Sequence, residues 1–170
     1  MANAPPRARP PAGSGLRPVD EPTRVEVDHR QLGVDLFNHA WTLLELAERT
    51  SEQDDELIHT AHASRWHWGH AGTAINLARG EWQLSRVYAV LGRSEPALHH
   101  ARRCLAYVES ATDAEDWDLP YAHEALARAS RLDGDPEAAA AHAATARGLA
   151  AHVVDAEDRE HLAHDLADLP

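Results

Sequence analysis

The chain has 170 residues and a formal net charge of -12 with histidine neutral. This length fits one domain with a sizeable core. All 16 basic residues are arginine, which excludes a lysine Schiff base and the lysine-bearing phosphate loop. An acidic chain is also a poor general binder of nucleic acid, because neutralisation of phosphates supplies most of that affinity.

Cysteine content and hydropathy exclude further classes of protein. The single cysteine, Cys104, rules out an intramolecular disulfide framework. No run of about 18 apolar residues is present, so no membrane-spanning helix is expected. Residues 1–22 contain arginine and proline but lack the apolar region of a secretory signal. These features predict a cytoplasmic protein.

Composition divides the chain at about residue 24. Residues 1–24 hold more than half of the ten prolines and have few apolar side chains. Such a segment cannot offset the conformational entropy lost on ordering, so we expect a disordered tail. The tail carries a charge of about +2, which leaves about -14 for residues 25–170. Those residues are expected to form a single domain.

The domain is predicted to be all-α. Ala, Leu, Glu and Arg dominate, and β-branched residues are scarce. No segment long enough for a β-strand alternates apolar and polar residues with period two. Gly92 and Gly134 suit positions just past a helix end. Ser94 and Asp135 each have the form of a helix N-cap with a proline in the following turn. Seven helices are expected, at about residues 27–49, 52–70, 73–91, 94–111, 115–132, 135–151 and 156–168.

A weak internal repeat emerges when Gly92 is aligned with Gly134, an offset of 42 residues. The aligned positions share a large–small pair on a first helix and small residues at i, i+4 and i+7 on a second. Small residues at that spacing let two antiparallel helices approach closely. The aligned pairs are Leu84 and Leu126, Ser85 and Ala127, Glu95 and Glu137, Ala97 and Ala139, His100 and His142, Ala101 and Ala143, and Cys104 and Ala146.

The segment from Trp82 to Leu105 resembles a tetratricopeptide repeat. The matching residues are Leu84, Ser85, Tyr88, Gly92, Ala97, Ala101, Cys104 and Leu105. The runs His62–Trp68, Ala78–Gln83 and Ser85–Tyr88 are also similar to a group of small bacterial helical proteins that have no established activity. The resemblance implies a stack of antiparallel helical hairpins in which the first helix of each pair lines a concave face.

Arginine and tryptophan gather on adjacent predicted helices and mark the candidate binding surface. Arg79, Trp82 and Arg86 lie on one helical stripe by spacing alone, and the resemblance implies that this stripe faces the concave side. Arginines beside aromatic rings suit a carboxylate or phosphate next to an apolar group. We therefore expect a non-catalytic binding module for a protein, a peptide or a small anionic ligand. The groove is predicted to comprise Arg65, Trp66, Asn76, Arg79, Trp82, Arg86, Tyr121 and Arg128.

An alternative interpretation of the same residues stays open. Trp82 would be an ordinary core residue, and the arginines would pair with nearby acids such as Glu81, Glu124 and Asp118. Cys104 follows two arginines but occupies a small-residue packing position, which predicts a buried and inert thiol. The sequence is also compatible with a homodimer.

Histidine is the second anomaly, at 13 of 170 residues. Glu56, His59 and His62 follow one another at i, i+3 and i+6 spacing on a predicted helix. Extending the repeat backwards points His59 and His62 towards the preceding helix, which carries Asp35 and His39. A transition metal held by these residues would make the protein a small metal-dependent enzyme, the alternative function class. The interpretation we favour is that the histidines are hydrogen-bonded or solvated, with no cofactor.

Overall fold

The computed structural model describes residues 26–170, and the tail expected at residues 1–24 lies outside them. Within the described residues every regular element is an α-helix, which confirms the all-α fold. None of these helices has the length and apolar character needed to cross a bilayer. In chain order the helices are α1 (His29–Leu44), α2 (Ser51–Ala71), α3 (Ala74–Val90), α4 (Ser94–Ser110), α5 (Asp118–Leu132), α6 (Pro136–Ala150) and α7 (Ala156–Leu166).

Local signals account for most of the helix ends. Gly92 and Gly134 adopt positive φ values of 70° and 81°, the left-handed conformation that ends a helix at low cost with glycine. Asp135 caps α6 as expected, because its side chain accepts a hydrogen bond from the Ala138 backbone N–H. The expected cap at Ser94 is wrong by one residue: Arg93 holds the cap position and Ser94 is the first residue of α4.

The end of α1 differs most from the sequence-based bounds. The helix ends at Leu44, although the periodic pattern continues to residue 49 without a glycine or proline. Arg49 gives the physical reason. Its guanidinium lies 3.5 Å from the carbonyl oxygens of Leu43 and Leu46, and its Nε donates to Asp54 at 2.8 Å. The side chain thereby satisfies carbonyls at the end of α1 and ties them to the start of α2.

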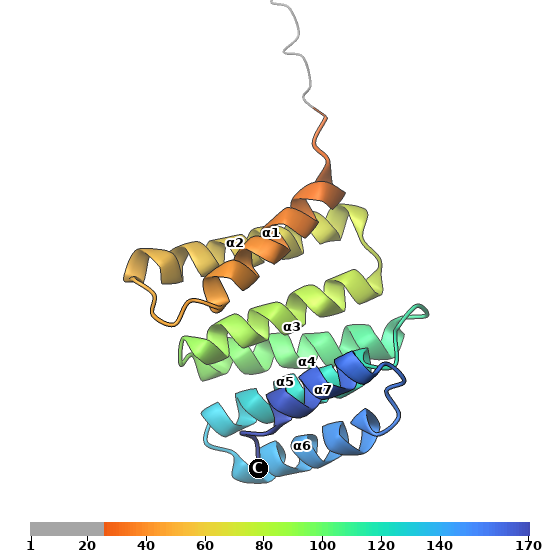
Figure 1. Cartoon of the computed structure of the whole chain (residues 1–170). Coiled ribbons are helices and arrows are strands. Elements are labelled where there is room, and N and C mark those ends of the chain that lie inside the picture. Colours follow the sequence, from red (N-terminus) through yellow and green to blue (C-terminus); the bar gives the residue numbers. More distant parts are fainter. Residues whose placement is uncertain (1–25) are drawn as a thin grey trace, which may run out of the picture.

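Consecutive helices form hairpins that follow one another through the molecule (Figure 1). The helix α1 packs on α2, α3 on α4, and α5 on α6. Between hairpins, α2 contacts α3, α4 contacts α5, and α3 also contacts α5. The last helix, α7, packs against α6 and α5. The helices α1, α3 and α5 are thus the first helices of their hairpins, and α7 follows the last hairpin.

Small residues at the repeat positions form the helix contacts. Ala97, Ala101 and Cys104 of α4 are at most 2% exposed, as are Ala143 and Ala146 of α6. The expectation of a buried thiol is confirmed, since Cys104 is 2% exposed, and this burial raises the pKa of the thiol well above its ordinary value. Alanine in these positions allows close approach of the paired helices, so the second helix of each hairpin fits tightly against the first.

The first hairpin makes its close contact through Gly33. A Cβ atom at this position would lie 2.9 Å from Cε2 of the Trp68 ring, and the buried Ser64 hydroxyl donates to the Gly33 carbonyl at 2.7 Å. Gly148 provides a contrast, because a Cβ there would meet nothing within 4 Å.

We expect Gly33→Ala and Gly148→Ala to change stability in opposite directions. Gly33→Ala should destabilise the fold by about 1–2 kcal/mol, because overpacking against the Trp68 ring outweighs the gain in helix propensity. Gly148→Ala should stabilise it by about 0.5–1 kcal/mol, because alanine restricts the unfolded chain without a clash. Urea denaturation followed by circular dichroism measures both. Stabilisation by Gly33→Ala would contradict the close contact.

Candidate functional site

A cavity of about 380 Å³ opens between α1, α3, α4, α5 and α7. Its most distinctive feature is aromatic content, since more than half of the Phe, Trp and Tyr residues of the chain line it. The aromatic residues are Phe37, Trp41, Trp82, Trp117 and Tyr121, and the other lining residues are Ala78, Arg79, Cys104, Val108, Asp118 and Asp158. Concave apolar sites with few polar groups are the usual form of a ligand pocket.

The aromatic rings form a continuous wall. Ring centroids of Trp41 and Trp82 are 5.5 Å apart, those of Trp82 and Tyr121 are 5.2 Å apart, and those of Trp117 and Tyr121 are 6.1 Å apart. Phe37 continues the wall beside Trp41 at 6.4 Å. These separations lie in the range of favourable aromatic pairs, so the rings support one another's positions. Helical spacing places Phe37 beside Trp41, because these two residues are one turn apart on α1.

Arg79 is the cationic side chain in the lining, and its charge is balanced inside the protein. Its Nε and Nη2 donate to the two carboxylate oxygens of Asp118 at 2.9 and 3.0 Å. The Asp118 side chain is 2% exposed. The Arg79 guanidinium also lies 4.2 Å from the centroid of the Trp117 ring. The geometry is a bidentate ion pair combined with a cation–π contact, which holds Arg79 against the wall.

The other arginines of the predicted groove are balanced in the same way. Arg86 donates to Asp165 at 2.9 Å. Arg128 pairs with the fully buried Glu124, which also accepts from Nε1 of Trp82 at 3.1 Å. Burial, with the nearby charge of Arg86, lowers the pKa of Arg128 to about 10. These arginines and acids therefore link α3, α5 and α7 along one side of the molecule.

The structure brings some of the predicted site residues together and separates others. Arg79, Trp82 and Tyr121 line the cavity. Arg86 and Arg128 line an adjoining hollow with Asp165. Asn76 lies beside Arg79 in a smaller depression, and its side chain accepts from the Thr73 backbone N–H at 2.9 Å.

Arg65 and Trp66 do not join this groove. Trp66 is 58% exposed on α2 and contacts the rings of His29 and His70. Arg65 pairs with Glu81, which is two residues along α3 from Arg79 and therefore on roughly the opposite side of that helix. Each acid named in the alternative interpretation pairs with an arginine of the predicted groove: Glu81 with Arg65, Asp118 with Arg79, and Glu124 with Arg128.

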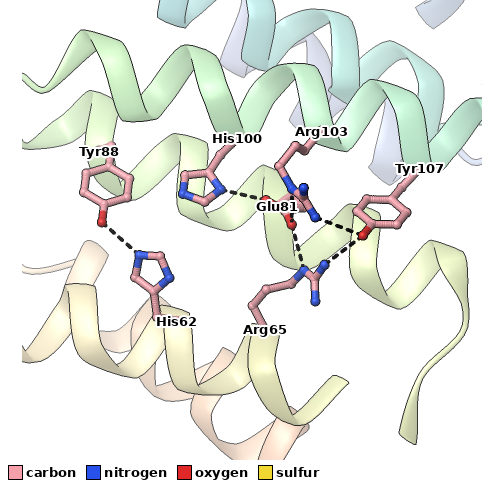
Figure 2. Close-up of polar contacts among 7 residues, drawn as sticks. All are labelled: His62, Arg65, Glu81, Tyr88, His100, Arg103 and Tyr107. Carbon is pink, nitrogen blue, oxygen red and sulfur yellow. Dashed lines mark hydrogen bonds and ion pairs between the residues drawn. The ribbon is translucent and has the colours of Figure 1, made fainter. Parts of the chain in front are cut away.

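Glu81 is the centre of a buried polar network (Figure 2). Its Oε1 accepts from Nε of Arg65 and from Nε of Arg103, each at 2.9 Å, and its Oε2 accepts from Nδ1 of His100 at 2.6 Å. The Tyr107 hydroxyl accepts from the same two arginines, at 3.2 and 3.0 Å. The network joins α2, α3 and α4 through one carboxylate.

Electrostatics keep Glu81 ionised. Burial alone would raise the pKa of Glu81, but hydrogen bonds from His100 and Arg103 and the charge of Arg65 outweigh burial and lower the pKa to about 2. The side chain is only 3% exposed, so its charge depends on these partners. Sequence reasoning named Glu81 only as a partner for the arginines, and missed His100, Arg103 and Tyr107. A buried position for an acid facing two arginines is a tertiary property that spacing does not reveal.

The candidate metal ligands of the first two helices do not converge on a common point. His39 donates from Nε2 to Glu56 at 2.8 Å, and Asp35 accepts from Gln31 at 2.8 Å. His62 is hydrogen-bonded to the Tyr88 hydroxyl of α3 at 2.8 Å. Within residues 26–170 no three His, Cys, Asp or Glu side chains are arranged to hold one metal ion.

The expected orientation of His59 and His62 is wrong. Both are exposed, and the buried positions of α2 include Leu57, Ala61 and Ser64. These residues have the i, i+4, i+7 spacing of Ala97, Ala101 and Cys104, but at an offset of 40 residues rather than 42. The two-residue difference turns His62 away from α1 and towards α3. There, partial desolvation against α3 and α4 and the proximity of His100 lower the pKa of His62.

The predicted groove did not include several residues that line the cavity, among them Phe37, Trp41, Trp117 and Asp158. The aromatic pair on the first predicted helix was a usable signal, because Phe37 and Trp41 share one face of it. Comparison with known proteins found no matching family model, no similar curated protein and no similar solved structure.

Proposed function

We propose that the protein is a non-catalytic binding module that holds a peptide segment in the groove around the aromatic cavity. The observation that carries this proposal is the gathering of Phe37, Trp41, Trp82, Trp117 and Tyr121 around about 380 Å³ of open space. Aromatic side chains in a concave, desolvated setting dominate the binding energy of protein interfaces. A cavity of this size accommodates one or two side chains of a bound peptide.

The arrangement of helices supports a tetratricopeptide-like solenoid as the scaffold. In such repeats the first helix of each pair lines the concave face, which is where these proteins bind their ligands. The aromatic residues of the cavity come from α1, α3 and the start of α5, and Asp158 comes from α7. The glycine turns and the contact of α3 with α5 agree with the same scaffold.

A peptide is a better candidate than the small anion that was also expected. Arg79, Arg86 and Arg128 each pair with a carboxylate of this chain. An incoming anion would have to displace Asp118 from a bidentate pair with Arg79, or bind beside it against charge repulsion. The arginines therefore position the walls of the groove, and the aromatic rings supply the contact surface.

The experiment compares two tryptophans. Selection of a random peptide library against the immobilised full chain should enrich peptides, and fluorescence anisotropy then measures their affinity. Trp41→Ala should weaken their binding by about 30-fold, since truncating a central aromatic costs on the order of 2 kcal/mol. Trp66→Ala, which removes an exposed tryptophan away from the cavity, should leave affinity unchanged.

Circular dichroism establishes that both variants fold, and Trp41→Phe provides a milder change at the same position. Failure to enrich any peptide above a bare matrix would overturn the proposal. Equal losses for Trp41→Ala and Trp66→Ala would place peptide binding outside the cavity.

A further inference from the structure

The charged side chains that line the aromatic cavity include one more carboxylate than cations. The ionisable acids and bases of its lining are Arg79, Asp118 and Asp158. Arg79 and Asp118 neutralise each other in their bidentate pair. The Asp158 carboxylate, in the first turn of α7, accepts no hydrogen bond and makes no ion pair with any residue from 26 to 170. The lining therefore has a net charge of about -1, and the Asp158 carboxylate can accept hydrogen bonds from a ligand.

The surroundings do not offset this negative charge. The neighbouring pairs Arg86 with Asp165 and Arg128 with Glu124 cancel internally. Burial, followed by the charges of Asp165 and Asp158, raises the pKa of Tyr121 to about 12. At larger distance, residues 25–170 carry a charge of about -14, which attracts cations towards the surface.

The aromatic wall also has an internal example of cation binding. The Arg79 guanidinium rests 4.2 Å from the Trp117 ring centroid, because the negative face of an aromatic ring attracts a cation. Trp41, Trp82, Tyr121 and Phe37 extend the same kind of surface around the open space. A second cation there would meet rings and the free carboxylate of Asp158.

Hydrogen-bonding capacity decides which cation fits. A primary ammonium needs three acceptors and a guanidinium has five N–H donors to satisfy. The lining offers the Asp158 carboxylate and the Tyr121 hydroxyl, while both oxygens of Asp118 already accept from Arg79 and the remaining surface includes Ala78 and Val108. A quaternary ammonium needs no acceptor and is attracted to aromatic faces through its polarised methyl groups.

We propose that the cavity binds a trimethylammonium group, held by the aromatic rings and balanced by Asp158. This rests on the proposed function and names the chemistry of the side chain that the groove takes. The group occurs both on a free small molecule such as choline and on a trimethylated lysine of a peptide, and the experiment separates these two sources.

Isothermal titration calorimetry on the full chain uses four probes. These are choline, its uncharged tert-butyl isostere 3,3-dimethylbutanol, a short peptide with trimethyllysine, and the same peptide with unmodified lysine. Choline and the trimethyllysine peptide should each bind at least about 10-fold more tightly than their matched partners, because only they combine a cation with a methylated surface. Tighter binding of the peptide than of choline assigns the peptide as the source, and the reverse order assigns the free molecule.

Two variants on α7 complete the test. Asp158→Asn should weaken binding of the trimethylammonium probes by about 10-fold, since it removes the balancing charge. Glu157→Gln removes one charge from the adjacent exposed position of the same helix turn, and should leave binding unchanged. Equal affinity for choline and its uncharged isostere, or equal effects of the two variants, would overturn the cation proposal while peptide binding in the groove stands. Absence of binding by every probe overturns the cation proposal as well, and the peptide-library selection then decides the proposed function separately.

Discussion

Replacing Glu81 with alanine should lower the free energy of unfolding by about 3–5 kcal/mol, the cost of removing one partner from a buried ion pair. The carboxylate holds Arg65 of α2 and both Arg103 and His100 of α4 within hydrogen-bonding distance. Its removal would leave two guanidinium groups facing each other across the space it vacates. The Tyr107 hydroxyl would then be the remaining shared acceptor of the two arginines.

Urea denaturation followed by circular dichroism measures this loss. Glu160→Ala is the matched control, because Glu160 is an exposed residue on α7, and its substitution should change stability by no more than about 0.5 kcal/mol. Glu81→Gln keeps the shape of the side chain and removes its charge, so it should cost less than alanine but more than the control. A loss below about 1 kcal/mol for Glu81→Ala would show that the network contributes little to folding.

Acid should remove the contribution of Glu81 in a defined pH range. Its pKa is about 2 in the folded protein, against an ordinary value of 4.5. Because the folded-state pKa is depressed, the stabilisation is fully present above about pH 4.5 and is lost as pH falls towards 2. A shift of this size corresponds to about 3 kcal/mol.

Urea denaturation at several pH values between 6 and 2.5, on the wild type and on Glu81→Gln, isolates this contribution. The other carboxylates titrate in both proteins, so the difference between the two stability curves reports Glu81 alone. We expect the gap between wild type and variant to narrow as pH falls below about 4.5, because Glu81 of the unfolded chain, which has the ordinary pKa, is protonated there while the folded protein keeps its carboxylate ionised. Parallel curves across the whole range would contradict a depressed pKa for Glu81.

The helices of this protein could be predicted because their signals are local. Helix propensity and the turns at Gly92 and Gly134 located the ends of α3 and α5, and Asp135 marked the start of α6. The end of α1 could not be predicted in this way. It depends on hydrogen bonds from the Arg49 side chain to carbonyls of the preceding turn, and these arise only after the chain has reversed direction.

The candidate site was predictable only along single helices. Helical spacing placed Arg79 and Trp82 on one stripe, and both line the cavity. Spacing could not show that Asp118, 39 residues away in sequence, neutralises Arg79. The gathering of arginine and tryptophan on adjacent predicted helices also assigned Arg65 to the same groove, although the structure turns this residue towards Glu81.

For this protein, sequence by itself determined the all-α character and most of the helix ends, because hydrogen bonds and propensities within a few residues decide those features. Tertiary structure alone decided which charges cancel and which rings meet. Trp41, Trp82 and Tyr121 come from three different helices, and the Asp158 carboxylate comes from a fourth. Their convergence depends on the close approach of hairpins through small residues. That approach is the physical origin of the cavity that we propose as the binding site.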